Sequence, residues 1–287
     1  VEILYNNARI DQALELVMGE IEKYPNQPEL QMAAYTLLKE KGQNSASQAY
    51  LMRGMASPDL DPEVKAKTFQ STLNELKTAK RDSLLDRMEI LMMESHSENA
   101  SILAAIGMRR EQSNQQNEAI SLYKKSLLLN PKNPQMLEKV ILNSFGEGSN
   151  LNEVETFTQM AVDEFPEAPE FWFYDGIVKS GLKKDSAAVT TLTKSLNLNA
   201  GKNKQLDQVA FGALGSSYYN LGQKDSSFHY FEKALRLNPE DEQVLNNYAY
   251  FLSLEKKDLD KALTMAEKVV QKNPTNSTVP MSPPVSK

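Results

Sequence analysis

Residues 211–239 read FGALGSSYYNLGQKDSSFHYFEKALRLNP, and this stretch decides the fold. Its apolar residues recur every three or four positions in two runs, as expected for two amphipathic helices. A short polar segment, Gly222-Gln223-Lys224, separates the two runs and predicts a turn between them. Pro239 closes the stretch, because proline cannot continue the preceding helix and suits the first turn of the next one. The stretch therefore predicts a helical hairpin.

The hairpin recurs along the chain with a period of about 35 residues. Four similar stretches end at Asn130-Pro131, Phe165-Pro166, Asn238-Pro239 and Asn273-Pro274. Successive prolines of this set lie 35, 73 and 35 residues apart, and 73 is about two periods. Such a period is typical of repeat proteins, in which each unit packs only against its neighbours.

Several copies of the hairpin resemble the tetratricopeptide repeat (TPR), whose pattern is W-x2-L-G-x2-Y on the first helix, A-x3-F on the second helix, and then proline. The matching copies are Leu103-x2-Ile106-Gly107 with Ala119-x3-Tyr123, Trp172-x2-Asp175-Gly176 with Ala188-x3-Leu192, Phe211-x2-Leu214-Gly215 with Ser227-x3-Phe231, and Leu245-x2-Tyr248-Ala249 with Ala262-x3-Ala266. The resemblance implies an all-α fold, an α-solenoid (right-handed superhelix) of about seven and a half TPR helical hairpins.

The repeats are expected to form a single TPR solenoid over residues 1–276. The pattern is degenerate over 28–97 and clear over 98–276, and a half-unit precedes it at 1–27. The predicted units are 28–62, 63–97, 98–133, 134–168, 169–203, 204–241 and 242–276. Residues 277–287 are rich in proline and serine, which predicts a disordered tail.

Small residues are expected where the two helices of a hairpin cross, because they let the backbones approach. Gly107, Gly176 and Gly215 hold this position on first helices. The small residues of the second helices, among them Ala119 and Ala188, are expected to face them.

Composition excludes several classes of function. The net charge is −6, and the basic residues form scattered doublets without a stripe that could follow a phosphate backbone, so no nucleic-acid partner is expected. The chain has no cysteine and only two histidines, His96 and His229, so neither a metal site nor a cofactor is predicted. His96 is expected at the surface at a helix end, and His229 partly buried. No nucleophile motif or carboxylate pair stands out, so the chain is predicted not to be an enzyme, and no apolar run could span a membrane.

The resemblance to TPR proteins implies that first helices line a concave groove that binds a protein or peptide. The leading hypothesis is therefore a non-catalytic scaffold or adaptor that holds a peptide or helix in this groove. Positions one turn apart on the first helices, outside the predicted hairpin core, give the candidate binding residues. They are Met108, Glu138, Leu142, Phe145, Phe173, Ile177, Tyr219, Asn246 and Tyr250.

Other interpretations stay open. The aromatic residues of the groove could instead pack against the neighbouring unit. The last predicted helix carries the apolar residues Leu263, Ala266, Val269 and Val270, so the chain could self-assemble through uncapped ends as a homo-oligomer. Aromatic side chains could also stack on a carbohydrate. The basic residues of the clamp that reads acidic chaperone tails are missing from the corresponding positions, which argues against that ligand.

A narrower resemblance concerns location. Residues 246–253, followed by 258–262, are similar to TPR proteins of the bacterial cell envelope. This resemblance favours the envelope or periplasm over the cytoplasm.

Overall fold

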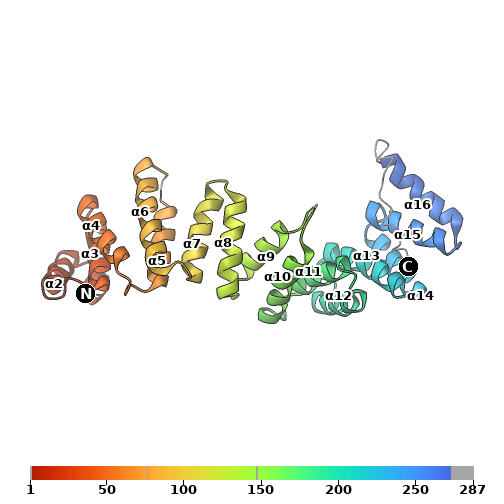
Figure 1. Cartoon of the computed structure of the whole chain (residues 1–287), viewed down its shortest axis with the longest axis horizontal. Helices are drawn as coiled ribbons and strands as arrows, with labels where there is room; N and C mark the ends of the chain where they lie inside the picture. Colours follow the sequence, from red (N-terminus) through yellow and green to blue (C-terminus); the bar gives the residue numbers. More distant parts are fainter. Residues whose placement is uncertain (1, 76, 147, 273–287) are drawn as a thin grey trace. The chain divides into compact units, whose positions relative to one another are not determined.

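The computed structural model describes residues 2–75, 77–146 and 148–272 (Figure 1). The predicted tail at 277–287 lies outside these residues. The chain divides into two compact units, residues 1–133 (unit 1) and 134–287 (unit 2), and each is described by itself. The prediction that residues 1–276 form a single solenoid stays a prediction.

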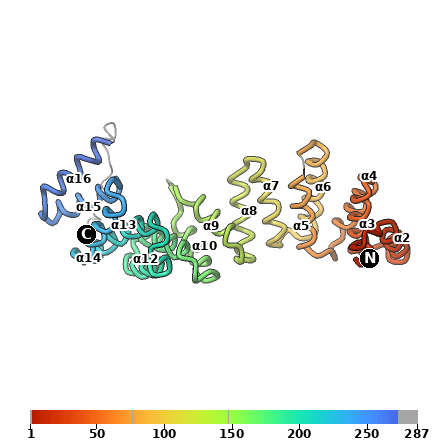
Figure 2. Tube along the Cα trace, turned by 180° about the vertical axis from the view of Figure 1, so that it is seen from behind, coloured from red at the N-terminus to blue at the C-terminus, as the bar shows by residue number. Residues whose placement is uncertain are grey.

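Unit 1 consists of α-helices throughout its described residues, and most of them form antiparallel pairs. Figure 2 shows this pairing from behind for α3 with α4 and for α7 with α8. The helices are α1 (Glu2–Asn6), α2 (Ile10–Lys23), α3 (Pro28–Glu40), α4 (Asn44–Ala56), α5 (Pro62–Leu73), α6 (Ala79–His96), α7 (Ala100–Gln112) and α8 (Gln116–Leu129).

Unit 2 repeats the arrangement with four more pairs over its described residues. Its helices are α9 (Pro134–Asn143), α10 (Leu151–Glu164), α11 (Pro169–Gly181), α12 (Asp185–Asn199), α13 (Lys204–Asn220), α14 (Lys224–Leu237), α15 (Glu242–Leu254) and α16 (Leu259–Lys272). Each predicted unit from 28–62 to 242–276 therefore contains one helix pair. The prediction of an all-α fold of about seven and a half helical hairpins is confirmed.

Local chemistry explains where the helices begin. Pro28, Pro62 and Pro169 stand at the first turn of α3, α5 and α11, where the missing backbone N–H is not needed. Asn99 and Asn203 cap α7 and α13, and each side chain accepts hydrogen bonds from two backbone N–H groups of the first turn. These signals repeat along the chain, so the hairpins do as well.

The turn inside five of the hairpins requires one residue in the left-handed conformation. Gly42 and Gly222 have φ of +71° and +75° in this place, where glycine meets no steric penalty. Asn114, Lys183 and Lys256 hold the same place with φ of +59°, +60° and +52°. A lysine has a Cβ that crowds the following carbonyl in this conformation, so its backbone is strained.

Replacing Lys183 with glycine should therefore stabilise the protein. The relief of left-handed strain exceeds the extra entropy of glycine in the unfolded chain, which leaves a gain of about 1 kcal/mol in the free energy of unfolding. Urea titration would measure it. The reverse change, Gly222→Lys, should cost a similar amount, and an unchanged or lower stability of Lys183→Gly would contradict the explanation.

Close approach of the paired helices depends on glycine, but the partner side chain differs from the expectation. A Cβ placed on Gly107 would lie 2.6 Å from the ring of Tyr123. On Gly176 it would lie 2.5 Å from Leu192, and on Gly215 2.7 Å from Phe231. The expectation that Ala119 and Ala188 face these glycines is corrected, because the large residue four positions later fills the space that the glycine leaves.

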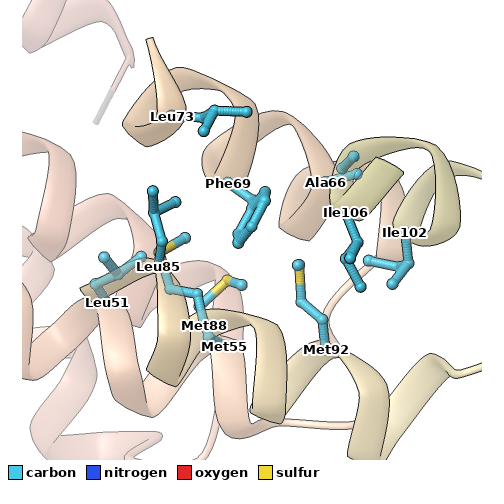
Figure 3. Close-up of a cluster of buried hydrophobic side chains, with 11 residues drawn as sticks. Leu51, Met55, Ala66, Phe69, Leu73, Leu85, Met88, Met92, Ile102 and Ile106 are labelled. Carbon is cyan, nitrogen blue, oxygen red and sulfur yellow. The ribbon is translucent and has the colours of Figure 1, made fainter. Parts of the chain in front are cut away.

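The core of unit 1 shows how α5 and α6 pack without the glycine of the TPR pattern. A single buried cluster runs through α4, α5, α6 and α7 (Figure 3). Phe69 lies at its centre in the view, beside Leu85, Met88 and Met92 of α6. Methionine is unbranched and fills irregular gaps, so α5 and α6 can pack without a glycine at their crossing. In the α3–α4 pair the glycine is Gly54 on the second helix, and it faces Met32.

Candidate binding surfaces

The predicted groove residues lie in both units. Met108 belongs to unit 1, where it is partly buried and packs against the buried cluster that contains Phe69. The other eight belong to unit 2. Of these, Glu138 and Leu142 on α9 are exposed, Leu142 by 48%. The remaining six are half-buried: Phe145, Phe173, Ile177, Tyr219, Asn246 and Tyr250.

Hydrogen bonds connect the first helices of unit 2 to one another. The hydroxyl of Tyr174 on α11 donates to Glu138 Oε1 on α9 at 3.2 Å. The hydroxyls of Ser180 on α11 and Ser217 on α13 lie 3.2 Å apart. Tyr219 on α13 donates to Glu255 Oε1, just after α15, at 2.8 Å. We call the helices α9, α11, α13 and α15, which these contacts join in sequence, the first-helix face.

Tyr174 and Tyr219 on this face stay protonated over the whole physiological range. Burial and the Glu138 carboxylate raise the pKa of Tyr174 to about 12. Burial and the hydrogen bond to Glu255 raise the pKa of Tyr219 to about 12. The Lys224 ammonium and the Tyr219 hydroxyl hold the pKa of Glu255 below its ordinary value. The face therefore presents the neutral hydroxyl of Tyr219 beside the ionised carboxylate of Glu255.

The aromatic residues of the first-helix face pack against the next hairpin with part of their side chains. Phe173 and Ile177 pack together against Leu192, Ala210 and Leu214, so they contact the next first helix. Tyr219 stacks on Phe251, with ring centroids 3.8 Å apart and planes 15° apart. The interpretation that these aromatic residues pack against the neighbouring unit thus holds for part of their surface. The part of their surface that stays exposed is available to a ligand.

A buried ion pair lies beneath the first-helix face. Asp175 is fully buried and accepts hydrogen bonds from Thr158 Oγ1 at 3.0 Å and from Lys179 Nζ at 2.5 Å. In the TPR pattern a leucine and a tyrosine stand near these two positions of the first helix. The ion pair lies within α11, and the hydrogen bond from Thr158 joins it to α10, so we assign it to stability and not to binding.

Clefts that the sequence analysis missed lie in unit 1. One of about 550 Å³ lies between α3 and α5, and a second of about 800 Å³ reaches from α3 to the beginnings of α4 and α6. Both are lined by Tyr35 and Lys39. A third, of about 470 Å³, lies among α6, α7 and α8, and Arg110 on its lining pairs with Glu89 and Glu118. The first two lie in the degenerate repeats, where the TPR pattern offered no alignment from which to choose groove residues.

The remaining features considered from the sequence are a metal site, a membrane span and the two histidines. In the described part of the chain, no group of three His, Cys, Asp or Glu side chains could hold a metal ion. None of the described helices is long and apolar enough to cross a membrane. His96 ends α6 and is half-buried. His229 is exposed, with its ring edge toward Tyr230, so the expectation of a partly buried histidine is wrong.

Comparison with protein families identifies the repeats. Family models described as "Tetratricopeptide repeat" match residues 209–241 and 230–264, which span α13 to α16. Residues 209–264 thus carry tetratricopeptide repeats. A search of the curated proteins gave no match for this chain.

Solved structures resemble this chain at low sequence identity. MamA from Desulfovibrio magneticus RS-1 (41-end) superposes with a TM-score of 0.50 at 17% identity, covering 62% of this chain and 97% of that one. YrrB, titled a TPR protein with an unusual peptide-binding site, gives 0.48 at 18% identity over 65% of this chain and 93% of its own. Cut9–Hcn1 of the APC/C gives 0.48 at 16% identity over 93% of this chain and 50% of that one. The likeness to MamA shows the fold alone.

Proposed function

We propose that this chain is a non-catalytic scaffold that binds an extended peptide or a helix of another protein along its first-helix face. The supporting observation is the series of contacts from Glu138 through Tyr174 and Tyr219 to Glu255, which joins four first helices in unit 2. A rigid surface of this kind loses little conformational entropy when it binds a ligand.

The side chains on this face suit a peptide ligand. Phe173, Tyr219 and Tyr250 offer half-exposed aromatic surface, and aromatic residues are typical anchors of protein interfaces. Leu142 adds an exposed apolar side chain, and Asn246 adds an amide that can bond to a peptide backbone. The mixture favours a peptide with alternating apolar and polar contacts.

A double variant, Phe173→Ala with Tyr250→Ala, tests the proposal. Peptides selected from a displayed library on the wild-type chain would be titrated against the variant. Loss of two aromatic anchors should weaken binding about tenfold or more, because each such truncation typically costs at least 1 kcal/mol. Leu142→Glu should weaken binding as well, and Leu142 is exposed, so this change should leave folding intact.

The matched control replaces two apolar side chains outside the face. Leu128 and Leu129 at the end of α8 are 61% and 53% exposed, and Leu128→Ala with Leu129→Ala should leave the affinity within twofold. Thermal unfolding of every variant must match the wild type. Selected peptides that bind all the variants equally well would contradict the proposed face.

Self-assembly is the second candidate, and one observation favours it. Leu259, Leu263 and Val270 of α16 are 54%, 59% and 62% exposed and follow one another at helical spacing. Phe228 of α14, which corresponds to Leu263, packs instead against Tyr248 of the following hairpin. Sedimentation over a wide concentration range distinguishes the candidates, since only self-assembly gives a mass that rises with concentration.

A further inference from the structure

One cleft of unit 1 concentrates positive charge in an acidic chain. Its volume is about 800 Å³, and its walls come from α3, the first turn of α4, the end of α5 and the first half of α6. The charged side chains that line it are Lys39, Glu75, Lys80, Arg81 and Arg87. Four cations and one carboxylate give the lining a charge of +3, whereas the whole chain has a net charge of −6.

Two of these cations are structural. Arg81 donates to Asp82 and to the backbone carbonyls of Leu73 and Glu75, so its guanidinium fastens the turn between α5 and α6. Lys39 Nζ lies 2.6 Å from Glu75 Oε1, and this pair neutralises the one carboxylate of the lining. Asp82 and Glu75 are thus neutralised by Arg81 and Lys39, and neither carboxylate balances the charge of the other cations in the cleft.

Lys80 and Arg87 are the cations that remain. They lie seven residues apart on one face of α6, and Ser83 and Leu84 line the cleft between them. Both side chains are exposed, and within the described residues neither forms an ion pair. A cleft with two unpaired cations two turns apart is suited to a ligand that carries at least two negative groups.

The opposite wall of the cleft also favours a negatively charged ligand. Asn44 and Ser45, in the first turn of α4, line the cleft. Gln43, the N-cap of this helix, makes no side-chain hydrogen bond to the turn, so the backbone N–H groups there lack a side-chain cap. The positive end of the helix dipole adds to the field of Lys80 and Arg87.

We propose that this cleft binds the oxyanions of an acidic peptide. Arg87 can hold a carboxylate or phosphate through two parallel N–H donors, and Lys80 adds a point charge two turns away. A long polyanion such as nucleic acid does not fit as well, because only Lys80 and Arg87 remain unpaired in this cleft and the chain as a whole is negatively charged. The site uses residues of unit 1, so it does not depend on the first-helix face.

The test uses the full chain and a fluorescent peptide of eight glutamates, with the eight-glutamine peptide for comparison. The wild type should bind the glutamate peptide and not the glutamine peptide. Lys80→Glu with Arg87→Glu should weaken binding at least tenfold, and Lys80→Ala with Arg87→Ala should give an intermediate loss. Added salt should weaken the wild-type complex more steeply than any residual binding by the double variant.

A control with the same change in total charge is Lys125→Glu with Lys132→Glu, since both lysines are exposed and neither lines a described cleft. This control should bind within threefold of the wild type. An equal loss in the control would overturn the site, because net charge alone would then explain binding. Failure of the wild type to bind the glutamate peptide would overturn it too.

Two further binding measurements show which oxyanion the cleft prefers and whether the first-helix face takes part in binding. A phosphoserine peptide that binds more tightly, with the same dependence on Lys80 and Arg87, supports the oxyanion site and identifies phosphate as its preferred source. The variant Phe173→Ala with Tyr250→Ala should bind the glutamate peptide like the wild type. Loss of binding in that variant would overturn the assignment to unit 1, so the two proposals can fail separately.

Discussion

Replacing Phe69 with alanine is expected to lower the free energy of unfolding by about 3–5 kcal/mol. The side chain is fully buried and lies in the cluster that α4, α5, α6 and α7 share. Truncation removes the transfer free energy of the ring and leaves a cavity. The neighbours Leu85, Met88 and Met92 belong to one helix, so they cannot all move in to fill it (Figure 3).

Urea unfolding followed by circular dichroism would measure the loss. Phe69→Leu keeps most of the volume and should cost about 1–1.5 kcal/mol, which makes it the matched control. Val64→Ala on the same helix is exposed and should change stability by about 0.5 kcal/mol or less. A loss below about 1.5 kcal/mol for Phe69→Ala would mean that the methionines close the cavity and that the cluster is loosely packed.

Replacing Lys179 with methionine is expected to lower the free energy of unfolding by about 3–5 kcal/mol at neutral pH. The change leaves the carboxylate of Asp175 fully buried with only the Thr158 hydroxyl as its partner. Removing one partner of a buried ion pair is costly, because the charge that remains has lost both its solvation and its counter-ion.

The comparison that isolates this effect is a second change at Asp175. Asp175→Leu together with Lys179→Tyr replaces the pair by the residue types of the TPR pattern and should be about as stable as the wild type, since apolar replacements of buried ion pairs are often neutral or stabilising. Lys204→Met, at an exposed lysine, should change stability by about 0.5 kcal/mol or less. If Asp175→Leu with Lys179→Tyr lost as much stability as Lys179→Met, the uncompensated carboxylate would be ruled out as the cause.

The helix pairs could be predicted from sequence because their signals are local. Pro28, Pro169 and Asn99 act on the turn in which they stand, and Gly222 sets the conformation of one residue. Because these signals recur with a period of about 35 residues, the spacing also predicts hairpins in residues 28–97, where the motif itself is degenerate. Spacing predicted the pairs α3–α4 and α5–α6 where residue types did not.

The binding surfaces were less accessible to such reasoning. The helical repeat selected Phe173, Ile177 and Tyr219, and the structure shows each of them partly engaged with the neighbouring hairpin. The cleft with Lys80 and Arg87 was missed, although their seven-residue spacing on one helix was a visible signal. Nothing in the local sequence shows that α4 begins opposite this face.

By itself, then, the sequence determined the number of hairpins, their boundaries and the family, because proline, glycine and capping residues act within one or two turns. The tertiary structure alone decided which large side chain enters the space above each glycine, where Asp175 finds its partner, and where positive charge collects in an acidic chain. These features depend on the register between helices that are about 15 to 45 residues apart in sequence, and packing of the whole surface sets that register.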